Sequence, residues 1–174
     1  YAMKIDRAVL EINGGCNYKC EMCPQTNPKR DRSFLVKMPL DTFEDQLRQQ
    51  RPNVVNLDGS GEATLNRDLP RYIELVKKYG AKCHIFSNGY NFGGKLANDS
   101  WNAGLDLFRF SIIGYNEELY CNWMGMKPMH WDKVMENLYT SQLYYPDKTA
   151  TYHLITDNKN IDHEVDQYIA LVDG

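Results

Sequence analysis

The sequence lacks any long hydrophobic run and any excess of basic residues. None of its apolar stretches approaches the roughly 20 residues that a membrane helix needs, so we expect no membrane span. Lysine and arginine number 20 against 23 aspartate and glutamate residues, which gives a formal net charge of −3. This balance argues against a nucleic-acid-binding surface as the main function. With 174 residues, of which 43% are apolar and 25% charged, the composition is that of one globular domain with a sizeable core.

Cysteine is scarce, and its distribution is uneven. There are five cysteines, whereas a secreted disulfide scaffold would be smaller, richer in cysteine and usually even in count. Cys16, Cys20 and Cys23 fall within eight residues, while Cys83 and Cys121 stand alone. Three thiols this close together indicate metal ligands in a reducing compartment, and we therefore expect a cytoplasmic protein. An isolated thiol such as Cys83 is expected to fill the core.

The remainder of the chain alternates between strand-like and helix-like segments. Hydrophobic patterning predicts strands at residues 7–13, 53–57, 82–86, 105–113 and 149–155, and helices at 41–50, 68–79, 95–103, 131–144 and 162–172. Asp41 is expected to cap the first helix, with Glu44 at the capping-box position. Val165, Ile169 and Val172 share one face of the last helix.

Five strand–helix units in succession predict an α/β fold with a parallel sheet and right-handed crossovers. In such folds the ligand site lies outside the carboxyl ends of the strands. The unusual residues of this sequence follow its predicted strands, at 14–24, 58–62, 87–89 and 111–114. We therefore expect these segments to converge on one rim of the sheet.

The spacing Cys-x3-Cys-x2-Cys lets one short loop wrap three thiolates around a small inorganic group. Four-iron clusters usually take four cysteine thiolates, so three would leave one iron open to an outside ligand. The alternative is zinc, which takes four tetrahedral ligands, typically as two separated pairs. A fourth zinc ligand could come from Cys83, His84 or His130, although none has paired spacing with the triplet.

The segment Cys16–Pro24 resembles the cysteine motif of the radical S-adenosylmethionine (radical SAM) superfamily, especially members with a SPASM or twitch auxiliary domain. Asp58–Glu62 is similar to the Gly-Gly-Glu motif of that family, Ser87–Gly89 to its Thr-Asn-Gly motif and Ser111–Gly114 to its Ser-x-Asp-Gly motif. Tyr120–Gly125 is similar to Tyr-x-x-x-Arg-Gly, with Met124 at the arginine position. That departure leaves the partner of the SAM carboxylate unidentified.

The resemblance implies a role for each matching residue. Cys16, Cys20 and Cys23 would ligate a 4Fe–4S cluster, whose fourth iron would be chelated by the amino and carboxylate groups of SAM. The backbone of Gly59, Ser60 and Gly61 would approach SAM closely, and Glu62 would accept a hydrogen bond from its ammonium group. The Met22 backbone would contact the adenine. Asn88 and Ser111 would make further contacts with SAM. Several of these have plainer readings. Glu62 could cap the segment that follows it, Gly59 and Gly61 could be ordinary turn residues, Asn88-Gly89 is a common turn pair, and Ser111 could satisfy a buried backbone group.

The resemblance also implies an architecture and partners. The family's partial parallel (β/α) barrel usually has six units and this sequence shows five, so residues 1–174 would be a radical SAM core domain without the sixth strand or a C-terminal auxiliary domain. Such an enzyme would cleave SAM reductively to a 5′-deoxyadenosyl radical and abstract hydrogen from a peptide, sugar, cyclitol or nucleotide. It would need an external one-electron donor of the flavodoxin or ferredoxin type. Two alternatives are a non-catalytic, zinc-stabilised α/β binding module and a radical SAM fold that has lost turnover.

Overall fold

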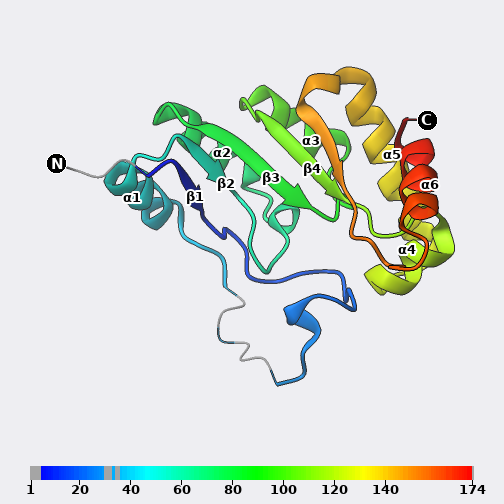
Figure 1. The fold of residues 1–174 in the computed structure, drawn as a ribbon. Coiled ribbons are helices and arrows are strands. Elements are labelled where there is room, and N and C mark those ends of the chain that lie inside the picture. The colour runs from blue at the N-terminus through cyan, green and yellow to red at the C-terminus, as the bar shows by residue number, and fades with distance from the viewer. Residues whose placement is uncertain (1–4, 30–32, 34–35, 174) are drawn as a thin grey trace.

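The sheet of the protein is parallel throughout. A computed structural model describes residues 5–29, 33 and 36–173. Its strands are β1 (Arg7–Val9), β2 (Val54–Asn56), β3 (Lys82–Ser87), β4 (Leu107–Ser111) and β5 (Thr149–Tyr152). They form one sheet in the order β1-β2-β3-β4-β5, and every neighbouring pair is parallel (Figure 1). The predicted α/β class with five strand–helix units is confirmed, and the sheet is open between β1 and β5.

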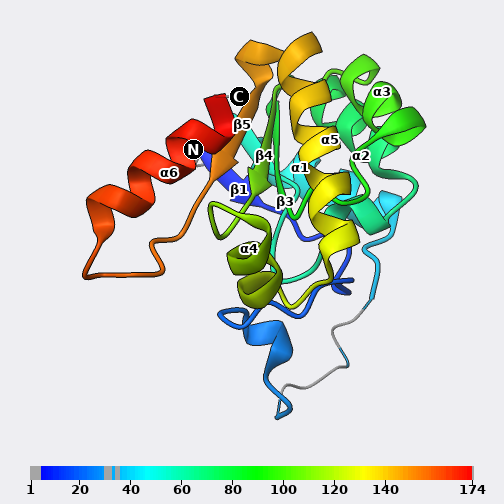
Figure 2. The same ribbon diagram turned by 90° about the vertical axis from the view of Figure 1, so that its right-hand side faces the viewer.

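Helices connect the strands and cover the sheet on one side. They are α1 (Leu40–Gln50), α2 (Leu69–Lys78), α3 (Gly94–Asn102), α4 (Glu117–Met124), α5 (Pro128–Tyr144) and α6 (Ile161–Asp173). In Figure 2, α2, α3 and α5 back the sheet, α6 flanks β5, and α4 lies at the carboxyl ends of the strands. None of the helices in the described ranges combines the length and the apolar character of a membrane span.

The core lies between the sheet and the helices that back it. Alternate strand residues point to opposite faces, and those facing the helices are fully or almost fully buried, including Ala8, Val55, Cys83, Ile85, Phe108 and Phe110. The residues between them stay partly exposed. Cys83 is therefore the core residue that its isolated position suggests. The opposite face of the sheet, which we call the open face, carries the intervening side chains.

The predicted helix and strand positions match the structure, but several elements differ in length. Strands β4 (Leu107–Ser111) and β5 (Thr149–Tyr152) are shorter than the predicted 105–113 and 149–155. The first strand was expected over residues 7–13, but β1 ends at Val9 and the chain continues to Asn13, which makes an isolated bridge with Lys37. Helix α5 begins at Pro128, ahead of the predicted start at residue 131. Helix α4 was not predicted, because it has only eight residues and buries only Tyr120 and Met124, too few to produce an apolar stripe.

Two local predictions were wrong. The N-cap of α1 is Pro39, so Asp41 lies inside the first turn, where its carboxylate accepts the N–H of Thr42 at 2.6 Å. In α6 the buried residues are Glu164 and Tyr168. Of the predicted apolar side, Val165 and Ile169 are at the surface, 36% and 49% exposed, and Val172 is partly buried against the core. The buried Glu164 accepts hydrogen bonds from Thr156, Asp157 and His153, and these contacts set the rotation of the helix.

Candidate functional site

The segments that follow the strands converge on one cavity. Its volume is about 270 Å³, and it opens at the carboxyl ends of β1 to β5. All ten residues that the sequence analysis assigned to a cluster or to SAM line it: Cys16, Cys20, Met22, Cys23, Gly59, Ser60, Gly61, Glu62, Asn88 and Ser111. The expected convergence on one rim is confirmed by this geometry, while the ligand role of each residue stays a prediction.

The cysteine loop contributes three unpaired thiols to this cavity. Cys16 is exposed, Cys20 and Cys23 are half-buried, and none of the three forms a disulfide. Burial raises the pKa of the Cys16 thiol, and burial with the neighbouring Cys16 and Cys23 raises the pKa of Cys20 to about 12. Cys16 and Cys20 therefore disfavour ionisation, and a bound cation would favour their thiolate forms. This donor set fits an iron–sulfur cluster held by three cysteines.

Helix α4 supports the cysteine loop from outside. The hydroxyls of Tyr18 and Tyr120 share a buried hydrogen bond of 2.9 Å, and the N–H of Glu21 donates to the Trp123 carbonyl at 2.9 Å. The helix ends at Gly125, in a left-handed conformation (φ 64°) against the backbone of Lys19, where a side chain would collide with the Lys19 carbonyl. Helix α4, which the sequence analysis did not predict, therefore positions the cysteine loop, which it did predict.

The loop after β2 is clamped to the start of the cysteine loop. The carboxylate of Glu11 accepts the N–H of Gly61 at 2.6 Å and the hydroxyl of Ser60 at 2.9 Å. A Cβ on Gly61 would stand 1.8 Å from the Asn13 carbonyl oxygen, so only glycine fits there. The close approach seen in the structure is thus to the protein backbone, and approach to the methionine end of SAM stays a prediction.

Glu62 occupies the centre of a buried hydrogen-bond network. One carboxylate oxygen, Oε1, accepts the N–H of Thr64 (2.9 Å), the hydroxyl of Thr64 (2.6 Å) and the hydroxyl of Ser87 (2.7 Å). The other, Oε2, accepts the N–H of Asn88 at 2.9 Å. Glu62 caps the 3-10 turn Ala63–Leu65, as its plainer reading proposed. A carboxylate oxygen with one partner can still accept another donor, so the role toward the SAM ammonium is compatible with this cap.

Three further cavity residues differ in how firmly they are held. Asn88 donates its amide to the Asn17 side chain at 3.0 Å and so reaches across to the cysteine loop. The hydroxyl of Ser111 makes no hydrogen bond within the described residues, which leaves it available to a ligand. Met124 is 2% exposed, and its sulfur lies 3.8 Å from that of Cys20. The position of the family's arginine is therefore an apolar wall beside the cysteine loop.

Sequence reasoning missed the apolar wall of the cavity and two of its supports. The wall is made by Phe86, Ile113, Tyr152 and Leu154. Phe86 and Tyr152 pack edge to face, with ring centroids 5.0 Å apart. Glu11 and Asn13 were assigned only to a strand. The available signal was their polarity at the end of an apolar segment, just before Gly14 and Gly15.

The residues considered as a fourth zinc ligand lie elsewhere. Cys83 faces the helices in the core, His84 lies on the open face, and His130 packs on the ring of Tyr90 at 4.8 Å between centroids. None of the three lines the cavity, and no group of three His, Cys, Asp or Glu side chains in the described ranges is arranged to hold a single metal ion.

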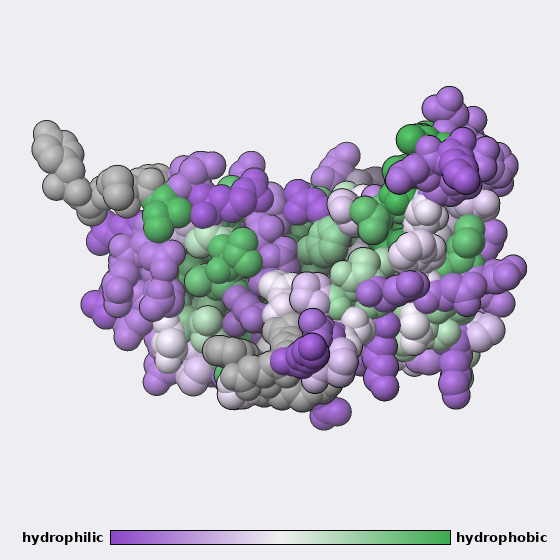
Figure 3. Space-filling model, turned by 60° about the horizontal axis from the view of Figure 1, so that its bottom comes forward, coloured by the Kyte–Doolittle hydropathy of each residue, from purple (hydrophilic) through white to green (hydrophobic). Residues whose placement is uncertain are grey.

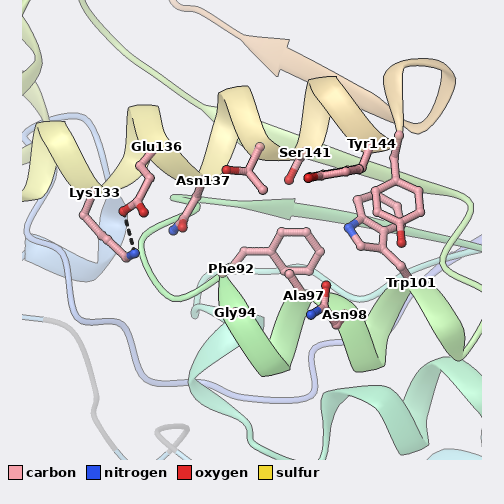
Figure 4. Close-up of a pocket in the computed structure, with 13 residues that line it drawn as sticks. Phe92, Gly94, Ala97, Asn98, Trp101, Lys133, Glu136, Asn137, Ser141 and Tyr144 are labelled. Carbon is pink, nitrogen blue, oxygen red and sulfur yellow. Dashed lines mark hydrogen bonds and ion pairs between the residues drawn. The ribbon is translucent and has the colours of Figure 1, made fainter.

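Another cavity, of about 430 Å³, lies on the outer layer between α3 and α5 (Figure 4). Lys133 and Glu136 form an ion pair at one end of it. Asn137 donates its amide to the carbonyls of Gly89 and Tyr90 and so holds the loop after β3 from behind. No predicted site residue lines this cavity. Its contact with the site is structural, because Asn137 stabilises the loop after β3.

Comparisons with known proteins agree with this geometry. Residues 10–170 match the model of the radical SAM superfamily. Among curated proteins, the chain is 26% identical over 139 residues to a probable GTP 3′,8-cyclase of Sulfolobus acidocaldarius, a match that covers 79% of this chain and 43% of that protein. The chain thus spans less than half of the length of this relative.

Two solved structures share the fold. SuiB of Streptococcus suis bound to S-adenosylmethionine has a TM-score of 0.72 at 19% identity, covering 98% of this chain and 39% of SuiB. BtrN in complex with AdoMet and 2-DOIA has a TM-score of 0.64 at 19% identity, covering 88% of this chain and 58% of BtrN. At this identity the likeness concerns the fold, and both neighbours are partial barrels of the same superfamily.

Proposed function

The chain belongs to the radical SAM superfamily, and we propose that it holds a 4Fe–4S cluster on Cys16, Cys20 and Cys23 and binds SAM in the adjoining cavity. The cofactors of the family are this cluster and SAM. The observation that carries the proposal is the placement of all ten assigned residues around one cavity at the carboxyl ends of the strands. Residues 1–174 are, on this proposal, the radical SAM core.

When bound and reduced, the cofactor pair supplies an electron that cleaves SAM and yields a radical able to abstract hydrogen from a substrate. The residues of the chain position the reactants and keep water away. Glu62 would accept a hydrogen bond from the SAM ammonium through Oε2, which has one partner within the protein. Ser111 would hydrogen-bond the ribose or methionine part, and the Met22 backbone would face the adenine. Phe86, Ile113 and Tyr152 supply an apolar wall that excludes water from the reacting centre.

The proposed substrate is a peptide, a sugar or cyclitol, or a nucleotide. Two of these classes occur among the similar proteins, since one is named a probable GTP 3′,8-cyclase and another, SuiB, has been solved with its precursor peptide SuiA. The cysteine motif supports a SPASM or twitch type of enzyme, with an electron donor of the flavodoxin or ferredoxin type. Neither the substrate nor the donor follows from the fold, which is common to all of these enzymes.

Anaerobic reconstitution with iron and sulfide tests the proposal. The expected product is brown, carries about four irons per chain and cleaves SAM to deoxyadenosine on reduction. Cys20→Ala should lose both properties. Cys121→Ala is the matched control, because Cys121 is also a half-buried free thiol but does not line the cavity. A colourless protein with one zinc and no affinity for SAM would contradict the proposal, and a bound cluster without deoxyadenosine would indicate a fold that has lost turnover.

A further inference from the structure

Polar and charged side chains gather on the open face of the sheet, next to the cavity. The register pairs Val9 with Asn56 and Asn56 with His84, so these three point to the same side. Phe86, two residues after His84, pairs with Arg109. None of these side chains belongs to the fully buried set that faces the helices. Figure 3, turned toward the lower side of the molecule, shows apolar surface in the middle of the view between hydrophilic side chains on either side.

Cations outnumber carboxylates in this part of the open face. Arg7, Lys82 and Arg109 alternate with core residues on β1, β3 and β4 and so share the face. The carboxylate among them is Asp58, which is half-buried and accepts the Asn56 amide at 3.2 Å. Glu11 lies two residues beyond the end of β1, and its carboxylate already accepts hydrogen bonds from Ser60 and Gly61. The balance is positive, so the face favours an anion.

His84 and Arg109 have unused hydrogen-bonding capacity. Within the described residues, neither side chain forms a hydrogen bond or an ion pair, although Nδ1 of His84 is buried. Arginine has five N–H donors and keeps its charge, so the Arg109 guanidinium is available to an anion. Burial, then the charges of Arg109 and Arg7, lower the pKa of His84. Asp106 acts on this imidazole in the opposite direction, but burial and the neighbouring cations outweigh it.

His84 and Arg109 each lie two positions before a cavity residue on the same strand. His84 precedes the cavity residue Phe86 by two positions on β3, and Arg109 precedes the cavity residue Ser111 by two positions on β4. Two residues along a strand span about 7 Å. An anionic group held by His84 and Arg109 would therefore place the rest of a small molecule against Phe86 and into the mouth of the cavity.

We propose that Arg109 and His84, assisted by Arg7, form a subsite on the open face for an anionic group of the substrate, a phosphate or a carboxylate. The inference rests on the proposed function, because it places this group beside the SAM cavity. It narrows the substrate class to molecules that carry such an anion close to the part that contacts the apolar wall, because Arg109 is the register partner of the wall residue Phe86.

Binding of two simple anions to the iron-loaded chain tests this subsite. Inorganic pyrophosphate and succinate are titrated by calorimetry in low salt, with S-adenosylhomocysteine present at saturation so that the SAM site is filled. Tighter binding of pyrophosphate assigns a phosphate, and tighter binding of succinate assigns a carboxylate. Arg109→Met should weaken the preferred anion by about tenfold or more, since a charge-assisted contact is lost. Arg71→Met, at an exposed arginine of α2, changes the net charge equally and should have less than about a twofold effect.

Two further variants make the test independent of the folding of Arg109→Met. Asp58→Asn removes the nearby carboxylate and should tighten binding of the anion, and His84→Gln should weaken it. Failure of both anions to bind, or equal weakening by Arg109→Met and Arg71→Met, would overturn the subsite. Iron content and binding of S-adenosylhomocysteine are measured on the same samples. If the protein keeps its iron and binds S-adenosylhomocysteine but does not bind the anions, the subsite is wrong and the proposed function stands.

Discussion

Gly61 lies so close to Asn13 that a methyl group on its Cα would stand 1.8 Å from the Asn13 carbonyl oxygen. The side-chain amide of Asn13 in turn donates to the Glu62 carbonyl at 2.9 Å and to the Gly15 carbonyl at 2.8 Å. The loop after β2 and the start of the cysteine loop are therefore one packed unit. A substitution in either loop should therefore shift the cysteines assigned to the cluster.

Gly61→Ala should destabilise the protein, because the new methyl group can be accommodated only by separating the two loops. Overpacking of this kind costs about 2 kcal/mol or more of unfolding free energy. Gly15→Ala in the same unit is the control, since the nearest atom to its Cβ would be 3.9 Å away, and it should change stability by less than about 1 kcal/mol. Urea denaturation and iron content after reconstitution measure both effects. Equal stability of the two variants would show that the loops are not clamped.

Tyr120→Phe should loosen the cysteine loop from α4. The variant leaves the buried Tyr18 hydroxyl without its partner, which costs about 1–3 kcal/mol. The double variant Tyr18→Phe with Tyr120→Phe should be less destabilised than the sum of the single variants, because it removes both polar groups. Tyr144→Phe serves as a control at an exposed tyrosine. Strict additivity in the double-mutant cycle would contradict a direct hydroxyl pair.

Glu62→Gln should lower both stability and affinity for SAM. The amide group of glutamine would face at least one donor, the N–H of Asn88 or the donors around Oε1, at a cost of about 1–3 kcal/mol. Stability is read from urea denaturation, and binding of SAM is measured at a temperature where the variant is folded. Unchanged SAM affinity in the folded variant would assign Glu62 to capping alone.

Acid should destabilise the protein through Glu164. This side chain is 1% exposed, and although burial acts to raise its pKa, hydrogen bonds from Thr156, Asp157 and His153 outweigh burial and lower the pKa to about 2. The unfolded value is about 4.3, so the stabilisation is present above that pH and is lost as the pH falls toward 2. It amounts to about 3 kcal/mol.

Glu164→Gln tests this pH dependence. The variant should be less stable than wild type at neutral pH, and the difference should shrink progressively below about pH 5. Glu136→Gln is the control, because Glu136 is exposed and pairs only with Lys133 across one helical turn. Urea midpoints measured from neutral pH to about pH 3 give the comparison. A difference between wild type and Glu164→Gln that stays constant over this range would refute the assignment.

Much of the fold could be predicted because the relevant signals are local. The helix predicted over residues 68–79 is α2, and Leu69, Ile73 and Val76, which recur at helical spacing within it, are all fully buried. Gly80, with φ of 74°, follows that helix in the left-handed conformation that glycine adopts readily. The prediction failed where a local pattern competes with a distant contact. Val165 and Ile169 are as apolar as a core stripe, yet the hydrogen bonds of Glu164 turn that stripe outward.

The candidate site was likewise predictable only where its signals are local. The spacing of Cys16, Cys20 and Cys23 is a property of one short loop, and it was enough to identify the family. Glu11 and Arg109 could not be assigned from the sequence, because the residues that lie near them come from distant parts of the chain. Glu11 holds a loop about 50 positions away along the chain, and Arg109 shares a face with His84 only through the register of β3 and β4.

The sequence by itself determined the kinds of element, their order and the cysteine spacing, because hydrogen bonding within a helix and side-chain periodicity act over a few residues. Only the tertiary structure decided which side chains meet. The register between parallel strands brings Phe86 beside Arg109, and the packing of two loops makes glycine obligatory at position 61. Such contacts depend on how distant segments pack, which no local pattern encodes.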